Sequence, residues 1–258
     1  MIAACTMFEP LIIIPARMAS TRLPGKPLAQ IAGQPMILHV VARAVESRVG
    51  RVVVAAGDEE IVDTVRQAGV EVVLTRPDHP SGSDRVHEAL QIIDPQGRHD
   101  VVINLQGDLP LVEPADLQRV LEPLQDPDVA LGTLVAEVTS AEEAASNSVV
   151  KVACSFADEA GSCARALYFS RQPIPWGAGP LWHHVGIYAW RRDALARFVA
   201  LPPSALEQRE SLEQLRVLEA GMTISCARTD RAPHGVDTLA DLEFVRRIVE
   251  GRVVGEAV

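Results

Sequence analysis

Three positively charged side chains lie close together in the loop that follows the first apolar run of the chain. They are Arg17, Arg22 and Lys26, and Ser20 and Gly25 lie among them. Arginine forks match phosphate oxygens, and glycine lets the backbone approach a ligand closely. In a chain whose formal net charge is -10, this local cluster predicts a site for a polyphosphate. The alternative is a solvated surface loop that is basic by chance.

The loop lacks two well-known phosphate-binding motifs. Neither G-x-x-x-x-G-K-[ST] nor G-x-G-x-x-G occurs in it. The sequence therefore argues against a P-loop kinase and against a standard dehydrogenase.

Two aspartates are candidates for holding a divalent cation. Asp108 directly follows Gly107 at the end of an apolar run. Mg²⁺ takes one or two carboxylates together with phosphate oxygens, so Asp108 near a phosphate loop predicts a magnesium site. Asp237 could supply a second carboxylate. Its alternative role is to precede a helix N-terminus, because Thr238 and Asp241 have the spacing of a capping pair.

The segment SGSDR at residues 81–85 comes just before a predicted helix. Ser81 or the aspartate can cap that helix. The same segment can also form a pocket for a nucleobase, with backbone groups near Gly82 and the side chain of Arg85 as selective contacts. Arg76 is a weaker candidate for this pocket. The two roles are compatible.

Strands and helices must bring these residues together. In the first half, β-branched runs predict strands at residues 11–14, 51–55, 70–75 and 100–105, and amphipathic spacing predicts helices at 36–48, 59–68, 84–93 and 114–124. This alternation predicts a parallel sheet with helices on both faces. Residues 15–35 show no clear periodicity. A loop of that length at the end of a strand is typically functional.

The second half is less regular. We expect strands at residues 129–138, 149–155, 164–169, 185–190 and 222–227, and helices at 206–220 and 239–249. Several of these strands follow one another without a helix, which predicts antiparallel pairing. The expected fold class is α/β, with a Rossmann-like mixed, mostly parallel sheet and a smaller antiparallel lobe. We expect one domain over 1–258, with halves at 8–125 and 126–235 and a C-terminal helix in 236–258.

Composition excludes several classes of protein. The chain has 258 residues, of which 48% are hydrophobic and 22% charged, so it is neither disordered nor collagen-like. No apolar run approaches the ~20 residues of a membrane-spanning helix. An acidic chain without a basic run is a poor candidate for binding duplex nucleic acid.

The four cysteines, Cys5, Cys154, Cys163 and Cys226, lack zinc or redox spacing. Together with the absence of an export signal at the start, they predict a cytoplasmic protein with reduced thiols.

Taken in order, the motifs resemble those of the 3-deoxy-manno-octulosonate cytidylyltransferase (CMP-Kdo synthetase) family. The matching segments are IIPAR at 13–17, STRLPGKPL at 20–28, SGSDR at 81–85, NLQGD at 104–108, ALYFSR at 166–171, HVGIY at 184–188, LEQLR at 212–216 and GVDT at 235–238. The resemblance extends from residue 8 to about residue 248. Any single segment would be weak, but the ordered set is specific.

The resemblance implies an enzyme of the nucleotidyltransferase type. It would transfer CMP from CTP to the anomeric hydroxyl of 3-deoxy-D-manno-octulosonate (Kdo) and release pyrophosphate, which activates Kdo for lipopolysaccharide biosynthesis. Catalytic roles would fall to Arg17, Arg22, Lys26, Asp108 and Asp237, with Mg²⁺ held by the two aspartates. The expected nucleotide contacts are Pro15, Ala16, Arg17, Ser20, Arg22, Lys26, Arg76, Ser81, Gly82, Arg85 and Asp108.

The second half would bind the acid sugar and border a homodimer contact. The expected sugar contacts are Gln106, Tyr168, Arg171, His184, Tyr188, Glu213 and Gln214. We expect Arg171 and His184 to offer positive charge to the sugar carboxylate. Core packing is the alternative for the tyrosines and for a lone histidine. Glu207 and Glu210 are expected to be solvated.

The chain also departs from the family pattern. Leu109 replaces a usual glutamate after Asp108, and Ala56-Gly57-Asp58 stands where many members carry Thr-Asp. The stretch 176–183 is shorter than in many relatives, which affects the sugar pocket and the subunit contact. A cytidylyltransferase for another acid sugar, such as a nonulosonate, is the nearest alternative. A catalytically silent nucleotide-binding protein is an alternative of another class.

Overall fold

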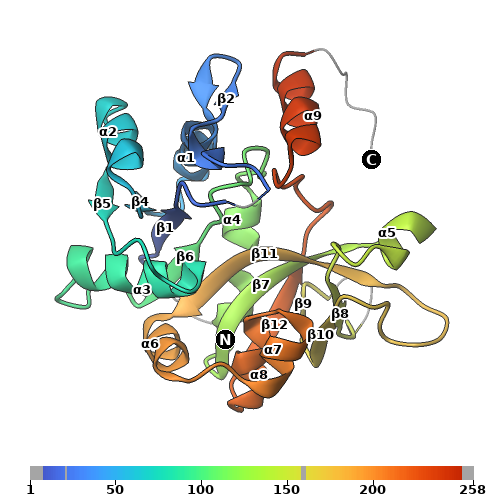
Figure 1. Cartoon of the computed structure of the whole chain (residues 1–258). Helices are drawn as coiled ribbons and strands as arrows, with labels where there is room; N and C mark the ends of the chain where they lie inside the picture. The colour runs from blue at the N-terminus through green and yellow to red at the C-terminus, as the bar shows by residue number, and fades with distance from the viewer. Residues whose placement is uncertain (1–7, 21, 158–160, 252–258) are drawn as a thin grey trace. The chain divides into compact units, whose positions relative to one another are not determined.

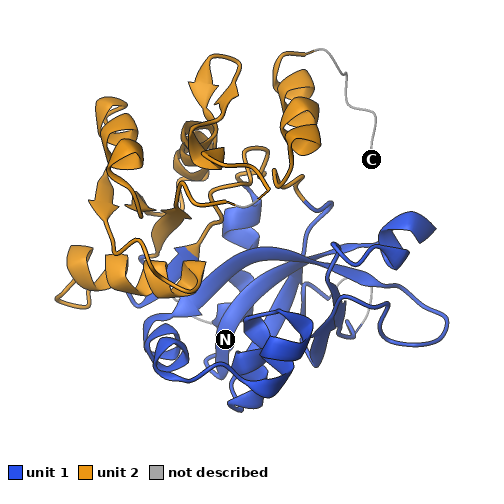
Figure 2. Cartoon of the chain, viewed as in Figure 1, with its two compact units in different colours: residues 1–9, 99–103, 115–232 blue, residues 10–98, 104–114, 233–258 orange. Residues whose placement is uncertain are grey.

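The structure, a computed structural model, describes residues 8–20, 22–157 and 161–251. Thr21 and Cys5 lie outside these ranges. The chain forms two compact units (Figure 2). Unit 1 comprises residues 1–9, 99–103 and 115–232, and unit 2 comprises 10–98, 104–114 and 233–258. The division into functional halves, with nucleotide binding in residues 8–125 and sugar binding in residues 126–235, stays a prediction.

Three parallel strands of unit 2 form its sheet in the order β5-β4-β1 (Figure 1). They are β1 (Leu11–Ala16), β4 (Arg51–Ala56) and β5 (Val72–Leu74). The side chains of Leu11, Ile12, Ile13 and Ile14 are fully buried, because both faces of this strand are covered. The predicted strands at 11–14 and 51–55 are confirmed, and the third is shorter than predicted.

Four helices of unit 2 follow the predicted amphipathic segments. They are α1 (Met36–Glu46), α2 (Glu59–Gln67), α3 (Gly82–Ile93) and α9 (Leu239–Val249). Ser81 caps α3 by accepting a hydrogen bond from the amide of Asp84, and Thr238 caps α9 in a capping box with Asp241. The predicted caps are confirmed.

The long segment after β1 contains more structure than its lack of periodicity predicts. It includes the short helix η1 (Lys26–Leu28) and a hairpin of β2 (Gln30–Ile31) and β3 (Gln34–Pro35). The hairpin turns at Ala32 and Gly33, which both have positive φ, at 46° and 80°. Such a turn matches the twist of the paired strands.

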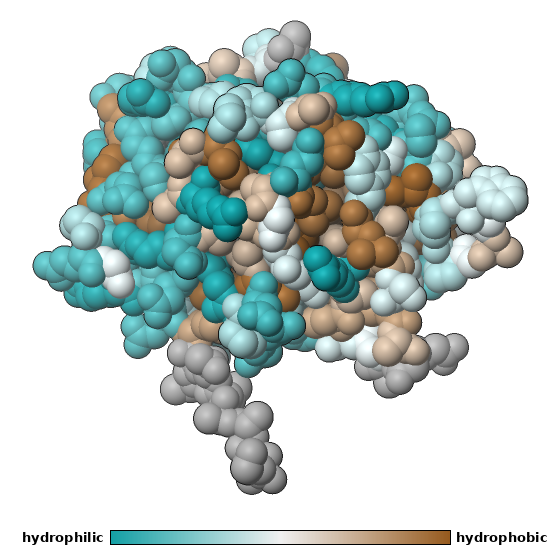
Figure 3. Space-filling view, turned by 90° about the horizontal axis from the view of Figure 1, so that it is seen from below, coloured by the Kyte–Doolittle hydropathy of each residue, from teal (hydrophilic) through white to brown (hydrophobic). Residues whose placement is uncertain are grey.

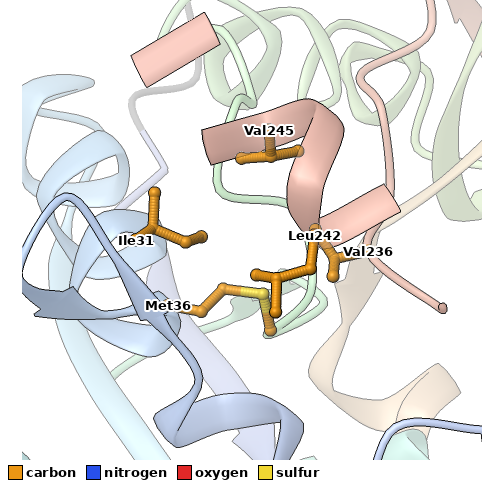
Figure 4. Packing of buried hydrophobic residues seen from close by; sticks show 5 residues of the cluster. All are labelled: Ile31, Met36, Val236, Leu242 and Val245. Carbon is orange, nitrogen blue, oxygen red and sulfur yellow. The ribbon is translucent and has the colours of Figure 1, made fainter. Parts of the chain in front are cut away.

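A small hydrophobic core joins the two ends of unit 2 (Figure 4). It contains Ile31 of β2, Met36 of α1, Val236, and Leu242 and Val245 of α9. Burying these side chains removes apolar surface from water and holds the start of α9 against the β2–β3 hairpin. The segment that carries Asp237 is thereby packed against the β2–β3 hairpin. This hairpin directly follows the basic loop at residues 17–26, called the phosphate loop below.

Unit 1 contains a mixed sheet with the order β6-β11-β7-β12-β9. Its strands are β6 (Val101–Asn104), β7 (Val129–Glu137), β9 (Cys163–Arg165), β11 (Trp182–Arg191) and β12 (Thr223–Arg228). The last residue of β6, Asn104, belongs to unit 2. β11 is antiparallel to β7 and β9 to β12, while β12 is parallel to β7. β8 (Lys151–Ala153) pairs with β10 (Tyr168–Ser170) and with β11, in both cases antiparallel. The expected antiparallel pairing is thus confirmed for most of this sheet.

Unit 1 also contains α4 (Asp116–Arg119), η2 (Glu122–Gln125), α5 (Ala141–Ala145), α6 (Arg192–Ala200), α7 (Ala205–Glu210) and α8 (Gln214–Glu219). Helices α5 and α6 were not predicted.

Three predicted elements are divided in the structure. The helix expected at 114–124 ends at Arg119 and resumes as η2, because Pro123 lacks an amide donor and blocks a continuous helix. The helix expected at 206–220 breaks at Ser211, which has a left-handed φ of 56°. The strand expected at 164–169 becomes β9 and β10, which pair with different neighbours.

Among the described residues, no helix is long and apolar enough to cross a membrane. On the face shown in Figure 3, hydrophilic residues cover large areas, and smaller hydrophobic areas lie between them.

Candidate functional site

A pocket of about 360 Å³ lies in unit 2, where the loop after β1, the start of α3, the turn after β6 and the segment before α9 converge. The predicted site residues that line it are Pro15, Ala16, Arg17, Ser20, Arg22, Lys26, Ser81, Gly82, Arg85, Gln106, Asp108 and Asp237. The structure therefore brings together every predicted catalytic residue. Arg76 is absent from the lining, and its side chain is 66% exposed beside Asp78.

The two aspartates share one cation of the chain. Lys26 Nζ lies 2.7 Å from Asp108 Oδ2 and 3.2 Å from Asp237 Oδ1. Arg22 Nη2 lies 3.0 Å from the other oxygen of Asp237, Oδ2. The carboxylates come from segments 129 residues apart in sequence (237 − 108), and the amide of Val236 donates to the carbonyl of Asp108 at 2.9 Å. This backbone bond ties the two segments together.

These residues fit a magnesium site. Two carboxylates already converge on one position that holds a positive charge, and hard oxygen donors are the ligands that Mg²⁺ prefers. In the described part of the chain, no group of three or more His, Cys, Asp or Glu side chains could hold a metal ion. Any metal ligands beyond the two aspartates would therefore be groups other than such side chains, and phosphate oxygens of a substrate are suited to this.

Neighbouring loops hold the phosphate loop in place. The amide of Gly57 donates to the carbonyl of Ala16 at 2.9 Å, and the amide of Met18 donates to Asp58 Oδ2 at 2.8 Å. Arg17 Nη1 donates to the carbonyl of His79 at 3.4 Å. These bonds place the start of the loop at the carboxyl ends of the parallel strands, where ligands of open sheets bind.

Gly107 allows the turn before Asp108 to approach the phosphate loop. A Cβ atom at this position would lie 2.8 Å from the carbonyl oxygen of Pro15, closer than real Cβ contacts. The amide of Leu105 also donates to the carbonyl of Ile13 at 3.1 Å. Leu109 is buried and lies close to Gly235. This position therefore packs the turn instead of adding a carboxylate.

Arg85 occupies the base of the pocket, where it is only 2% exposed. Its Nη1 donates to the hydroxyl of Thr75 at 2.6 Å and to the carbonyl of Arg76 at 2.9 Å, and its Nη2 donates to the carbonyl of Pro77 at 3.3 Å. Burial, together with the nearby charge of Arg17, lowers the pKa of Arg85. Its guanidinium thus holds the loop after β5 as well as lining the pocket.

Six predicted sugar contacts belong to unit 1. They are Tyr168, Arg171, His184, Tyr188, Glu213 and Gln214. Gln106 is the seventh and lines the pocket of unit 2, where its side-chain amide donates to Asn104 Oδ1 at 3.0 Å.

His184 does not supply the positive charge expected of it. Burial lowers its pKa from 6.5 to about 3, so its ring is neutral at neutral pH. Thr133 Oγ1 lies 3.1 and 2.9 Å from the carbonyls of Val185 and Ile187, which can only accept hydrogen bonds. The Thr133 hydroxyl donates to one of them, so its oxygen accepts the Nε2–H of His184 at 3.0 Å. Of the expected pair, Arg171 alone carries a charge.

The ring of His184 also contacts the ring of Tyr188, with 5.6 Å between their centroids. Tyr188 is buried, and burial together with the charge of Glu213 raises the pKa of its hydroxyl. Gln214 is 3% exposed at the first position of α8. His184, Tyr188 and Glu213 form one polar and aromatic group in unit 1.

Arg171 is held by backbone carbonyls. Its guanidinium donates to Glu210 O at 3.0 Å, to Asn147 O at 3.0 Å and to Ser211 O at 3.3 Å. The carboxylate of Glu210 accepts hydrogen bonds from the hydroxyls of Tyr168 and Ser170 and from the amide of Arg171, at 3.5, 3.0 and 3.2 Å. The expectation that Glu210 is merely solvated is therefore wrong.

The same expectation is wrong for Glu207. It forms the capping box of α7 with Ser204 and pairs with the buried side chain of Arg216. Burial opposes this charge, but the hydrogen bonds from Arg216 and Ser204 prevail and lower the pKa of Glu207. Ser211 ends α7, and the chain then folds so that α8 packs against α7. The continuous helix predicted from the sequence does not contain this contact.

Sequence reasoning missed two groups that support the pocket. His79 is buried, contacts Glu88 of α3 through Nε2, and offers its carbonyl to Arg17. Glu88 also accepts the amide of Arg76 at 3.1 Å. The only available signal was the spacing of Arg85 and Glu88, which lie on one face of a helix at i and i+3.

Three comparisons with known proteins agree with one another. The family model of the cytidylyltransferases matches residues 11–224. A 3-deoxy-manno-octulosonate cytidylyltransferase of Parvibaculum lavamentivorans is 58% identical over 246 residues, covering 95% of each chain. One from Methylobacterium radiotolerans is also 58% identical, covering 95% of this chain and 99% of its own.

A solved structure of CMP:2-keto-3-deoxy-manno-octonic acid synthetase complexed with CTP is similar over the same range. Its TM-score is 0.86 at 41% sequence identity, and the match covers 95% of this chain and 100% of that one. The predicted fold class, a mixed and mostly parallel α/β fold of the nucleotidyltransferase type, is confirmed by this similarity.

Proposed function

Because this chain belongs to the 3-deoxy-manno-octulosonate cytidylyltransferase family of nucleotidyltransferases, we propose that it transfers CMP from CTP to the anomeric hydroxyl of Kdo and releases pyrophosphate. One observation carries the proposal: a single pocket gathers Arg17, Arg22 and Lys26 with both aspartates. A silent nucleotide-binding protein would have no need to retain this complete set.

The cations of the phosphate loop would bind the triphosphate. Arg17 and Arg22 present planar groups that can bind two phosphate oxygens at once, and Lys26 adds a compact charge. Since the chain is acidic overall, with a net charge of -10, attraction of CTP must come from this local cluster. The backbone near Gly82 and the side chain of Arg85 line the same pocket and would contact the nucleobase.

Asp108 and Asp237 would hold Mg²⁺. When bound, Mg²⁺ would act as a Lewis acid that offsets charge on the phosphate oxygens. In nucleotidyl transfer the protein forms and breaks few bonds itself, so positioning and charge neutralisation dominate. Arg17, Arg22 and Lys26 would stabilise the charge that builds up on the departing pyrophosphate.

For the acceptor, Arg171 would bind the sugar carboxylate as a charged partner. His184 is neutral, so it would act by hydrogen bonding and by shape. Tyr188, Glu213, Gln214, Tyr168 and Gln106 complete the proposed sugar contacts. No histidine of this set is suited to remove a proton, because the pKa of His184 is about 3.

A pyrophosphate-release assay with CTP tests the reaction. We expect turnover with Kdo, little turnover with a nonulosonate, and loss of turnover when a chelator is added. Turnover with a nonulosonate but not with Kdo would reassign the acceptor. CTP binding without turnover on any acid sugar would favour the silent protein.

Asp108→Ala tests the aspartate assignment. We expect CMP transfer to fall by roughly 100-fold or more, because a carboxylate at the reacting centre is lost. Thermal melting should change little, because Asp108 is partly exposed at the pocket surface, with 31% of its side chain accessible. Near-normal turnover in this variant would remove Asp108 from the site.

Two further features extend the proposal. We propose that the enzyme acts in the cytoplasm, which is supported by the free thiols of Cys154, Cys163 and Cys226. We also propose a homodimer, which is supported by the apolar side chains of Trp176 and Leu167, exposed at 100% and 66%. Light scattering should give about twice the chain mass, and a monomer at assay concentration would contradict the dimer.

A further inference from the structure

Lys26 occupies the position proposed for the metal ion. Its ammonium lies 2.7 Å from Asp108 Oδ2 and 3.2 Å from Asp237 Oδ1, and its side chain is only 15% exposed. With Arg22 on the second oxygen of Asp237, two cations balance two carboxylates. The chain's own cations thus neutralise both of the carboxylates proposed to hold the metal ion.

The backbone around this cluster is held firmly. Gly25 has a left-handed φ of 69°, and its amide donates to the carbonyl of Met18 at 3.1 Å. The amide of Lys26 donates to Leu23 O at 3.1 Å, and Leu23 packs on the core cluster of Figure 4. The aspartate segments are joined by the bond from Val236 to Asp108. With the backbone held in this way, a rearrangement of the cluster falls to its long side chains, those of Lys26 and Arg22.

A metal ion and this ammonium compete for the same oxygens. Mg²⁺ binds carboxylate oxygens at about 2.0–2.1 Å, so a metal on Asp108 Oδ2 and Asp237 Oδ1 would lie in contact with the ammonium. Two positive charges so close repel strongly in a partly buried pocket. Lys26 must leave the carboxylates before both of them can hold a divalent cation.

We propose that Lys26 is an internal counter-ion that keeps the divalent cation out until a nucleoside triphosphate draws its ammonium away from the aspartates. This inference rests on the proposed function of the site. The triphosphate offers Lys26 new anionic partners in the same pocket, so nucleotide binding frees the carboxylates. Metal and nucleotide then bind cooperatively, and each raises the affinity of the other by the same factor.

Metal binding without nucleotide tests the inference. Mn²⁺, whose free ion is visible by electron paramagnetic resonance, is titrated into the full-length chain with no CTP or sugar. We expect Lys26→Met to bind Mn²⁺ at least about fivefold more tightly than the wild type, the lower end of typical coupling. Lys26→Arg keeps the charge and should retain weak binding.

Matched variants separate charge from position. Arg66→Met removes one positive charge from an exposed helix position of unit 2, at 67% exposure, and should bind Mn²⁺ like the wild type. Adding Asp237→Asn to Lys26→Met should abolish the gain. Circular dichroism checks that each variant folds, and Lys26→Gln replaces Lys26→Met if the latter does not.

The movement of Lys26 can be observed directly. Lys26 and Lys151 are the only lysines of the sequence. Isotope labelling of lysine side chains therefore gives two NMR signals, and the Lys26→Met variant assigns them. Adding CTP with a chelator should shift the Lys26 signal and leave the Lys151 signal in place, because the Lys151 ammonium is enclosed by three backbone carbonyls.

The outcomes distinguish this inference from the proposed function. Equal Mn²⁺ affinity in the wild type and in Lys26→Met, or an unmoved Lys26 signal at saturating CTP, would overturn the counter-ion role. Turnover that persists in chelator would instead overturn the metal assignment itself.

Discussion

The guanidinium of Arg85 lies directly against Gly57. A Cβ atom at Gly57 would lie 2.7 Å from Arg85 Nη1 and 3.0 Å from its Cζ. The absence of a side chain at Gly57 leaves room for the guanidinium. Arg85 in turn binds Thr75, Arg76 and Pro77. One arginine thus spans the loops after β4 and β5, at the base of the pocket.

Gly57→Ala should displace this arginine. We expect a loss of about 1–3 kcal/mol in the free energy of unfolding, the usual effect of overpacking, and a raised KM for CTP. Urea denaturation and steady-state kinetics measure the two effects.

A double-mutant cycle provides the control. In an Arg85→Lys background the bulky guanidinium is absent, so Gly57→Ala should cost clearly less than in the wild type. Equal losses in both backgrounds would show that the contact with Arg85 is not the cause.

At the scale of elements, the start of α9 determines where Asp237 lies. Thr238 accepts a hydrogen bond from the amide of Asp241, and Asp241 accepts hydrogen bonds from the amides of Asp237 and Thr238. Burial opposes the charge of Asp241, but the hydrogen bonds that its carboxylate accepts from the hydroxyl and amide of Thr238 and from the amide of Asp237 prevail and lower its pKa. The alternative from the sequence, that Asp237 only precedes the N-cap of a helix, is correct in part. Asp237 does precede the cap, and its carboxylate also lies in the pocket.

Thr238→Ala should weaken both the helix and the site. Loss of this N-cap should lower the free energy of unfolding by ~1 kcal/mol, within a range of 0.5–2. Activity should fall as well, because the backbone of Asp237 loses part of its support. Thr238→Ser keeps the hydroxyl and should restore both properties, and its failure to do so would contradict the cap.

The second prediction at this scale concerns strand β11, which contains His184. His184 has a folded pKa of about 3 against an ordinary value of 6.5. Because folding depresses this pKa, the associated stability is fully present above pH 6.5 and is lost as the pH falls toward 3. The free energy of unfolding should fall by up to about 1.4 kcal/mol per pH unit in this window.

His184→Gln isolates this contribution. Glutamine can still donate to Thr133 but does not titrate. The free energies of unfolding of the wild type and of His184→Gln should therefore differ less at acid pH than at neutral pH. The reason is that only the wild type loses the contribution of His184 as the pH falls. A constant difference from pH 7 to pH 4 would contradict the depressed pKa.

At the scale of the whole molecule, the pocket belongs entirely to unit 2. CTP with Mg²⁺ should therefore stabilise this unit before any sugar is present. At a ligand concentration 100 times Kd the expected stabilisation is about 2.7 kcal/mol.

Hydrogen exchange measured by mass spectrometry locates this effect. Increased protection is expected in residues 15–28, 81–85, 104–108 and 233–241. Protection confined to unit 1 would contradict the assignment of the nucleotide pocket. UTP at the same concentration gives the comparison that measures base selectivity.

The sequence alone determined the elements that depend on local periodicity and capping. The strand at 11–14, the helices α1, α2 and α9, and the caps at Ser81 and Thr238 follow from spacing and side-chain chemistry within a few residues. The family motifs likewise identified the cations and aspartates one by one. Local patterns sufficed because each of these features depends on neighbours in the chain.

Only the tertiary structure decided how these residues act on one another. The ammonium of Lys26 meets Asp237 across 211 residues, and the guanidinium of Arg85 finds the space left by Gly57. Burial lowers the pKa of His184, and Ser211 breaks a helix that periodicity would continue. Each of these facts depends on desolvation, close packing or contact between distant segments. None of those quantities is defined until the chain has folded.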